Sequence, residues 1–366
     1  MVSNSDDEVH EVHDVVIVGA GLAGVYAARS FEASGIEYVL MEARNRLGGR
    51  IVTTEEGFDL GASWFWPDIQ PAVAKLVKEL ELDSFDQNNQ GDVIFERMVR
   101  EATQRYGGRS QGKPSMRVSG GTGQLIRKLE KDIPSQRIQL RTKLKSLELH
   151  GSEVILTVEQ ENQTRLIRAK HVIAAVPPRV LEATVSFSPQ LEARDRKRWS
   201  ETPTWMAPHA KFFALYDKAF WIDDGLSGTA QSMIGPMLEI HDATTASGNA
   251  ALMGFLGISP AQRVALGDEA VKNVCIDQLV RIFGEQARYP TSTIIKDWAA
   301  DRLTSTAADI SAAGHIAAQK SPWVNGPWSK HLLLGGSETS EKDPGYVTGA
   351  IEAAQGAVRR LIEAQK

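Results

Sequence analysis

Cysteine is nearly absent from this chain: Cys275 is the only one in 366 residues, which excludes an internal disulfide framework. A basic stripe interleaved with aromatic residues is missing too, and the net charge is −5, so a nucleic-acid-binding protein is not expected. No window approaches the run of about eighteen apolar residues that a membrane-spanning helix needs. Residues 1–13 are polar and acidic, the reverse of a secretory signal peptide, so we expect a cytoplasmic protein.

What is present is an ordinary globular composition, with 42% hydrophobic and 24% charged residues. The length allows two domains. No metal-binding residues are predicted.

The most informative stretch is an apolar run followed by closely spaced glycines. Val15–Val18 is typical of a strand buried on both faces, and it leads into Gly19–Gly24, a G-x-G-x-x-G turn. The pattern then predicts a helix over Leu22–Ser34 and a second strand over Tyr38–Met41, which ends on Glu42. Strand, turn, helix, strand and acidic residue in this order predict a dinucleotide-binding βαβ unit.

Each of these residues has a physical reason to be there. Gly19 permits the tight turn, Gly21 lets the backbone approach a pyrophosphate, and Gly24 lets the helix pack closely on the strand. The first turn of the helix directs free N–H groups and a positive dipole end toward the anion. Glu42 can accept hydrogen bonds from ribose hydroxyls, and its charge would repel a ribose phosphate, which disfavours NADP.

The continuation, Glu42-Ala43-Arg44-Asn45-Arg46-Leu47-Gly48-Gly49-Arg50, resembles the E-A-R-x-x-x-G-G-R run of the flavin-containing amine oxidase family. This family includes monoamine, polyamine and L-amino-acid oxidases. The resemblance implies that the second glycine turn and Arg50 contact the FAD diphosphate, so FAD is the expected cofactor. It also implies an α/β fold, in which a Rossmann-type FAD domain with a parallel sheet and a β-meander is interleaved with a smaller mixed α+β substrate domain. We expect the FAD domain at 1–76, 115–197 and 300–366, and the substrate domain at 77–114 and 198–299.

Later segments resemble the family in order. Asp59–Trp66 matches a segment whose glycine and small residues pass under the flavin and whose aromatic residue, here Trp64, reaches the substrate cavity. The competing interpretation is a glycine turn followed by core aromatics. Trp66 is given no role. Val154–Val158 and Arg165–Ala169 predict the meander, and His171–Ala175 predicts a further strand.

Lys211, in the strand-like run Pro208–Tyr216, matches the family lysine that holds a water against flavin N5. Otherwise it simply ends an exposed strand, as lysines commonly do. Trp298 matches a tryptophan near the flavin. Tyr346 matches the tyrosine that flanks the substrate amine, its alternative being a half-buried core residue at a helix start.

Two departures from the family pattern stand out. The helical insert that roofs the substrate cavity in monoamine oxidases is replaced by a short polar stretch between Phe85 and Arg117. This favours a more open site, a bulkier substrate, or a roof supplied by a partner subunit. At Ala307 and Ala308 the chain lacks both the cysteine that bonds to the flavin and the aromatic residue after it. We therefore expect non-covalent FAD. Asp268–Phe283 predicts a helix that buries Cys275.

The expected reaction is oxidation of an amine to an imine, by hydride transfer to flavin N5 and reoxidation by O2 to H2O2. Two alternatives stay open: an FAD-dependent desaturase or isomerase of a bulky apolar substrate, and a flavin-binding protein completed by a partner. A carboxylate-binding arginine, as in L-amino-acid oxidases, is not singled out among Arg97, Arg100, Arg105 and Arg109. The sequence predicts neither the substrate nor the oligomeric state. The candidate catalytic residues are Lys211, Tyr346, Trp64 and Trp298. The candidate FAD-binding residues are Gly19, Gly21, Leu22, Ala23, Gly24, Glu42, Ala43, Arg44, Gly49, Arg50, Gly61, Ala62, Ser63, Trp64, Leu144, Trp298, Gly336, Ser337, Glu338, Gly345, Tyr346 and Val347.

Overall fold

The computed structural model describes residues 12–108, 115–311 and 316–364. The chain forms two compact units. Unit 1 comprises Met1–Gly49, Ile126–Trp205 and Gly314–Lys366, and unit 2 comprises Arg50–Leu125 and Met206–Ala313. This division differs from the expected domain ranges at 50–76, 115–125 and 300–313, which lie in unit 2, and at 198–205, which lie in unit 1. For the first two of these segments the contacts are local: the 59–63 turn accepts hydrogen bonds from Lys211, and Arg117 donates to the carbonyl oxygens of residues 243 and 244.

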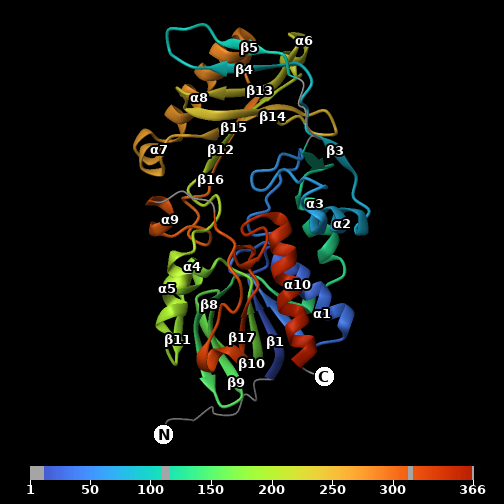
Figure 1. Ribbon diagram of the computed structural model, residues 1–366, viewed down its shortest axis with the longest axis vertical. Helices are drawn as coiled ribbons and strands as arrows, with labels where there is room; N and C mark the ends of the chain where they lie inside the picture. Colours follow the sequence, from blue (N-terminus) through green and yellow to red (C-terminus); the bar gives the residue numbers. More distant parts are fainter. Residues whose placement is uncertain (1–11, 109–114, 312–315, 365–366) are drawn as a thin grey trace. The chain divides into compact units, whose positions relative to one another are not determined.

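Unit 1 is built on an eight-stranded sheet that confirms the expected parallel sheet with a β-meander (Figure 1). Its parallel part brings β1, β2, β7, β10 and β17 together, and β8, β9 and β10 form the antiparallel meander. The strands follow the order β11 (Ser186–Ser188), β8 (Thr142–His150), β9 (Glu153–Gln160), β10 (Gln163–Ala174), β1 (Val12–Val18), β2 (Tyr38–Met41) and β7 (Ile138–Gln139), with β17 (Leu332–Leu334) paired to β10.

One strand prediction needs correction. Arg165–Ala169 and His171–Ala175 were expected as two strands, but β10 runs continuously through both. Its first half pairs with β9 in the meander and is largely exposed, whereas its second half lies buried between β1 and β17. The change in burial alters the side-chain pattern without interrupting the backbone.

Helices cover the sheet of unit 1. On one side, α1 (Leu22–Ser34) and α10 (Val347–Ala364) pack against each other (Figure 1). The ends of α1 agree with the sequence prediction, and Gly35 terminates it with a left-handed φ of 66°. A second core joins β-strand residues to the fully buried Trp199 of α5 (Ala193–Glu201) and Trp328.

Unit 2 contains a seven-stranded sheet with one face packed against α8 (Asp268–Phe283), a helix predicted with these bounds. Cys275 is buried in this core, as expected. The shortened stretch after Phe85 forms strands that extend the sheet. The strand order is β16 (Ser292–Asp297), β12 (Ala210–Tyr216), β15 (Ala250–Leu256), β14 (Met237–Asp242), β13 (Leu226–Ser232), β4 (Asp92–Glu96) and β5 (Gln104–Tyr106).

The described chain also contains smaller helices and strands. In unit 2 these are α2 (Pro71–Glu79), the paired strands β3 (Ser84–Asp86) and β6 (Met116–Val118), α6 (Phe220–Asp223), α7 (Pro260–Leu266) and α9 (Ala307–Ser311). Unit 1 adds α4 (Pro178–Thr184), and α3 (Gly123–Glu130) begins in unit 2 and ends in unit 1.

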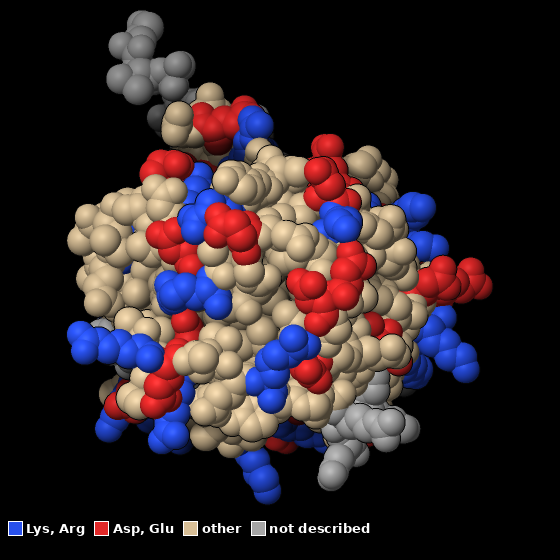
Figure 2. All heavy atoms as spheres, turned by 90° about the horizontal axis from the view of Figure 1, so that it is seen from above, with Lys and Arg blue, Asp and Glu red and all other residues tan. Residues whose placement is uncertain are grey.

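Surface charge is mixed. On the face shown in Figure 2, Lys and Arg side chains are interspersed with Asp and Glu side chains. Within the described ranges, the helices are all too short or too polar to cross a membrane.

Candidate active site

The glycine turn after β1 shows which of its glycines serve the fold and which leaves room for a ligand. Gly19 has φ +95°, and a Cβ there would lie 2.6 Å from Cγ1 of Val176. A Cβ on Gly24 would lie 1.9 Å from the carbonyl oxygen of Gly19. A Cβ on Gly21 would meet no described atom within 4 Å. Gly19 and Gly24 are therefore required by packing, while Gly21 leaves open space at the start of α1, with Leu22 and Ala23 in its first turn.

A second glycine turn lies directly on the first. The N–H of Gly48 donates to the carbonyl oxygen of Ala20 over 2.8 Å, and a Cβ on Gly49 would lie 3.0 Å from Cα of Gly21. The Arg46 guanidinium donates to the carbonyl oxygens of Leu47 and Gly49 and so holds this turn closed. The resemblance assigned donors from this turn to the diphosphate, and the structure brings it beside Gly21.

Glu42 connects the end of β2 to the glycine turn. Its side chain is buried, with one carboxylate oxygen accepting the N–H of Ala20 and the other the N–H of Arg44, each at 2.8 Å. The Arg44 guanidinium also lies 3.5 Å from the oxygen that accepts the N–H of Arg44. The other oxygen keeps a second lone pair, so the carboxylate can still accept from a ribose hydroxyl. The N–H of Thr142 donates to the Glu42 carbonyl oxygen, which brings the start of β8, and with it Leu144, to this edge.

A third glycine segment follows β17. A Cβ on Gly336 would lie 2.7 Å from the carbonyl oxygen of Val176, the residue that also limits Gly19. The buried Ser337 donates its hydroxyl to Glu338. The carboxyl ends of β1, β2, β10 and β17 therefore gather three glycine segments at one edge of a parallel sheet, where α/β proteins bind nucleotides.

The N-terminus of α10 carries two further candidate groups of unit 1, a threonine hydroxyl and a tyrosine ring. Thr348 lies in its first turn, and its buried hydroxyl has no hydrogen-bond partner among the described residues. Tyr346 directly precedes Val347, the first residue of the helix, and burial raises the pKa of the Tyr346 hydroxyl, with a smaller effect from Asp343. An unsatisfied buried hydroxyl beside an N-terminal helix dipole and the open space at Gly21 both fit a bound dinucleotide.

Trp205 is a neighbour of Tyr346 that the sequence did not reveal. The two ring centroids are 5.8 Å apart and the planes are tilted by 41°. Trp205 also packs on the backbone of Gly345, where a Cβ would lie 2.5 Å from Cβ of the tryptophan. The glycine at 345 is thus needed for this approach. A tryptophan between two prolines, Pro203 and Pro208, carries no periodic signal that could have singled it out.

In unit 2, the Lys211 side chain is buried. The alternative that this lysine simply ends an exposed strand is therefore wrong. Its ammonium donates to the carbonyl oxygens of Asp59 and Gly61, at 3.1 and 2.6 Å, and to the hydroxyl of Ser63 at 2.8 Å. Desolvation lowers the pKa of Lys211 to about 7, and the Asp59 carboxylate partly opposes this shift. Lys211 therefore braces the 59–63 turn. The role beside flavin N5 stays a prediction.

Asp59 is a second site residue missed by the sequence reasoning, although it opens the D-L-G segment. Its side chain is buried, and one oxygen accepts from Thr53 and from both the N–H and the hydroxyl of Thr122. The other oxygen has no hydrogen-bond partner within the described chain. Desolvation raises the pKa of this carboxyl, against the effect of these hydrogen bonds and of Lys211.

The two predicted tryptophans of unit 2 are fixed by hydrogen bonds at their indole N–H groups. Trp64 donates to the side-chain carbonyl of Gln87 over 2.7 Å, and Trp298 donates to the carbonyl oxygen of Leu60 over 3.1 Å. A Cβ on Gly61 would lie 1.8 Å from the carbonyl oxygen of Arg50 and 3.4 Å from Trp298. A side chain at position 61 would therefore clash with the backbone of Arg50, so this position requires glycine.

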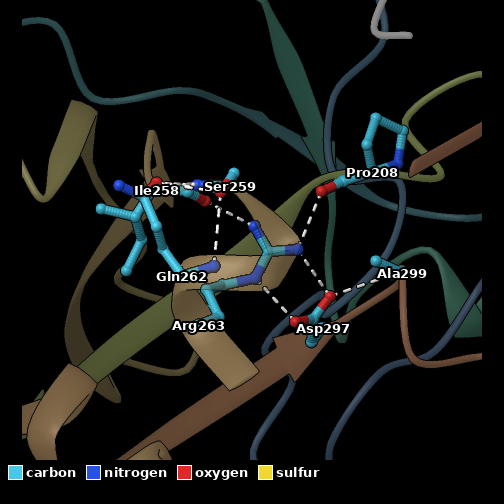
Figure 3. A network of polar contacts seen from close by, with 7 residues as sticks. All are labelled: Pro208, Ile258, Ser259, Gln262, Arg263, Asp297 and Ala299. Atoms are coloured by element: carbon cyan, nitrogen blue, oxygen red, sulfur yellow. Dashed lines mark hydrogen bonds and ion pairs between the residues drawn. The ribbon is translucent and has the colours of Figure 1, made fainter. Parts of the chain in front are cut away.

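An ion pair fixes the strand end that carries Trp298 (Figure 3). The Arg263 guanidinium meets the Asp297 carboxylate with two hydrogen bonds of 2.6 and 2.8 Å, and also donates to the carbonyl oxygens of Pro208 and Ile258. Asp297 in turn accepts the N–H of Ala299. One side chain thus joins α7, the end of β16 and the segment before β12.

The predicted site residues fall into two groups. Unit 1 holds Gly19, Gly21, Leu22, Ala23, Gly24, Glu42, Ala43, Arg44, Gly49, Leu144, Gly336, Ser337, Glu338, Gly345, Tyr346 and Val347, and unit 2 holds Arg50, Gly61, Ala62, Ser63, Trp64, Lys211 and Trp298.

The arginines that were candidates for binding a substrate carboxylate do not gather beside the predicted site residues of unit 1 or of unit 2. Arg97 and Arg100 are exposed, Arg105 pairs with Asp92, and Arg109 lies outside the described residues. The buried arginine of this region is Arg117, which donates to the carbonyl oxygens of Ala243 and Thr244.

Comparisons with known proteins agree with this arrangement. The flavin containing amine oxidoreductase family matches residues 101–362, and an NAD(P)-binding Rossmann-like domain matches residues 17–80. The flavin-containing amine oxidase B of Bos taurus is 23% identical, with 96% of this chain and 86% of the relative covered. That alignment extends over 458 positions, so the relative has residues with no counterpart in this chain.

Solved structures show the same fold. An engineered putrescine oxidase has a TM-score of 0.82 at 20% identity, covering 96% of this chain and 99% of its own. Cyclohexylamine oxidase from Brevibacterium oxydans has a TM-score of 0.80 at 19% identity, covering 97% and 100%. Because the family match spans most of the sequence and every motif lies in order, this chain is a member of the flavin containing amine oxidoreductase family.

Proposed function

We propose that this protein binds FAD non-covalently and oxidises an amine to an imine. The observation that carries the proposal is the three glycine segments at the carboxyl edge of the unit 1 sheet, with open space at Gly21. Family membership supports a flavin as the cofactor. The amine loses two electrons and two protons, O2 takes up both to become H2O2, and water hydrolyses the imine.

When bound, FAD supplies the acceptor for the hydride equivalent and passes the electrons to O2. The protein's part is to bind and orient. The N–H groups at the start of α1 and the second glycine turn would hold the diphosphate, and Glu42 the ribose. Tyr346 and Trp205 present an aromatic surface suited to a neutral amine, whose lone pair must be free to stabilise the charge that develops at the adjacent carbon.

Non-covalent binding is supported by the residues that could have formed a bond. The position matching the family cysteine is Ala307, at the start of α9. Cys275 is buried in the α8 core, where burial raises the pKa of its thiol to about 12. Acid precipitation should therefore release all the flavin into the supernatant. Flavin that stays with the precipitated chain would contradict this.

The reaction is tested by mixing the purified yellow protein anaerobically with a panel of primary, secondary and polyamines. We expect one amine class to bleach the oxidised-flavin absorbance, and peroxide to form when air is admitted. A yellow protein that no amine bleaches would instead favour the desaturase or isomerase reaction, for which Ala308 in place of an aromatic residue is the supporting observation.

A variant at Lys211 distinguishes an enzyme from a protein in which the flavin has only a structural role. Lys211→Met removes the side chain that holds the 59–63 turn, and we expect the rate of flavin reduction or reoxidation to fall at least about tenfold. Unchanged rates in this variant would support the flavin-binding alternative. Lys218→Met, which alters an exposed lysine of the same unit, is the matched control.

A further inference from the structure

Two helices of unit 1 leave an open groove between them. Helices α1 and α10 pack against each other (Figure 1), and the groove follows the second half of α10 with a volume of about 440 Å³. Tyr26 of α1 lines it together with Val358 and Ile362 of α10. The Gln355 side-chain amide donates to the Tyr26 hydroxyl over 2.8 Å, which joins the two helices. None of these residues belongs to the candidate site at the carboxyl edge of the sheet, so the groove is a separate feature of unit 1.

Two opposite charges also line this groove. Arg359 and Glu363 lie four residues apart on α10, and both are exposed. Side chains at this spacing on a helix are close enough to form an ion pair. Among the residues that the structure describes, however, neither side chain forms an ion pair or a hydrogen bond, with the other or with a third residue. The groove therefore carries one cation and one carboxylate that can each take a partner from another molecule.

The helix α10 gains little from these two charges. The C-terminal end of a helix dipole is negative, so a carboxylate in the last turn, where Glu363 lies, is unfavourable. An acidic residue four positions before a basic one stabilises a helix more than the reverse order, and in α10 the arginine comes first. No basic residue of the described last turn compensates for the carboxylate. The stability of α10 therefore does not account for this pair of charges.

We propose that the groove between α1 and α10 binds the α10 helix of a second copy of this chain, in a twofold-symmetric dimer. Two helices related by a twofold axis perpendicular to them run antiparallel, and each contact between two residues then occurs twice. An axis level with residue 361, midway between the two charges, places Arg359 of each copy opposite Glu363 of the other. The surface is thus complementary in charge to itself.

The apolar residues of the groove fit the same occupant. The side chains on one helix form a ridge that packs into the groove of a neighbouring helix. Ile362 is half-buried and lies between the two charges in sequence, so in the dimer its side chain enters the groove of the other copy beside Val358 and Tyr26. Because this apolar surface is small and exposed ion pairs contribute little, we expect a dissociation constant in the micromolar range.

The test is sedimentation equilibrium of the full chain, purified with its cofactor, at chain concentrations from about 1 to 100 μM, which span a micromolar dissociation constant. Arg359→Glu and Glu363→Arg each place like charges opposite each other at two symmetric contacts, and the double variant exchanges the two charges. Lys197→Glu is the matched control, because Lys197 is an exposed cation on α5 of unit 1 with Glu201 four residues later. Far-UV circular dichroism confirms that each variant is folded.

We expect the average mass of wild type and of Lys197→Glu to rise with concentration from that of one chain, 40.0 kDa, toward twice this value. Each single variant should raise the dissociation constant of the dimer at least about tenfold, and the double variant should restore it to within about threefold of wild type. A wild-type protein that stays monomeric throughout overturns the inference. So does a dimer that Arg359→Glu leaves unchanged, which would form through another surface, and so does a double variant that dissociates as readily as the single ones.

Discussion

The Lys211 ammonium donates to the carbonyl oxygen of Gly61 over 2.6 Å, although the two residues are 150 positions apart in the chain. With the carbonyl oxygen of Asp59 and the hydroxyl of Ser63, this gives each of its three N–H bonds an acceptor. A buried lysine whose donors are all engaged holds backbone in place. The 59–63 turn is therefore fixed by a lysine whose pKa is lowered to about 7 by burial, so that it loses its proton more easily than an exposed lysine.

The protonation of Lys211 predicts how stability depends on pH. Its pKa is about 7 in the folded protein against 10.5 for an unperturbed lysine, so between these values the unfolded chain binds more protons. The free energy of unfolding therefore rises with pH in this window, by at most about 1.4 kcal/mol per pH unit from this one group. Below about pH 7 both states carry the proton and the contribution to the slope vanishes.

Urea denaturation of wild type and Lys211→Met, at pH values between about 6 and 9, isolates this effect. The difference in unfolding free energy between the two proteins should change with pH above about 7 and stay constant below it. A difference that does not vary over the whole range would show that Lys211 keeps an ordinary pKa.

Gly21 predicts a loss of flavin without a loss of fold. In Gly21→Ala the new methyl group meets no described atom within 4 Å, but it occupies the space in which we propose that the diphosphate binds. We expect a colourless protein whose apo form melts within a few degrees of wild-type apoprotein. Gly356→Ala, in α10, also places its methyl group in open space and should keep full flavin content. Flavin absorbance per chain and melting temperature are the measurements.

The contact between Trp205 and Tyr346 predicts an effect of ring loss on amine oxidation. Trp205→Leu removes the aromatic face that packs on Tyr346, and aromatic pairs contribute about 0.5–1.5 kcal/mol beyond their buried area. We expect kcat/KM for the best amine to fall about two- to tenfold, while Trp205→Phe retains most of the activity. Equal losses in both variants would mean that volume rather than aromatic character matters.

The Arg263–Asp297 pair predicts a large stability effect in unit 2. The Arg263 side chain is 5% exposed, and its guanidinium makes two hydrogen bonds to the carboxylate of Asp297, whose side chain is 21% exposed. Removing one partner of such a pair leaves the other desolvated, so Arg263→Leu should lower the unfolding free energy by about 2–4 kcal/mol. Urea denaturation measures this. Lys218→Met, which breaks the exposed Lys218–Asp223 pair, should change it by less than about 1 kcal/mol.

Local patterns were sufficient to predict much of the nucleotide-binding edge. The apolar run before Gly19, the helix that stops at Gly35 and the strand that ends on Glu42 are each determined by residues close together in sequence. The same holds for α8, whose apolar spacing gave its bounds and the burial of Cys275. These features follow from period, capping and glycine chemistry, which sequence displays directly.

The remaining site residues depend on contacts that sequence does not display. The burial of Lys211 depends on a turn far earlier in the chain, and the role of Asp59 depends on Thr53 and Thr122. Trp205 became recognisable only when Gly345 and Tyr346 were placed against it. Each is set by tertiary packing between segments distant in sequence, which local pattern and propensity do not encode.

The two faces of β12 carry a consequence for how this protein can change. Phe212 and Ala214 serve the α8 core while Lys211 and Phe213 serve the opposite face, so one seven-residue segment is shared by two unrelated sets of constraints. Inserting or deleting a single residue within it would exchange the two sets, moving Lys211 into the hydrophobic core and Phe212 onto the opposite face. Variation on the face that carries Lys211 should therefore arise by substitutions in the neighbouring strands β14 and β15, with the length of β12 held constant.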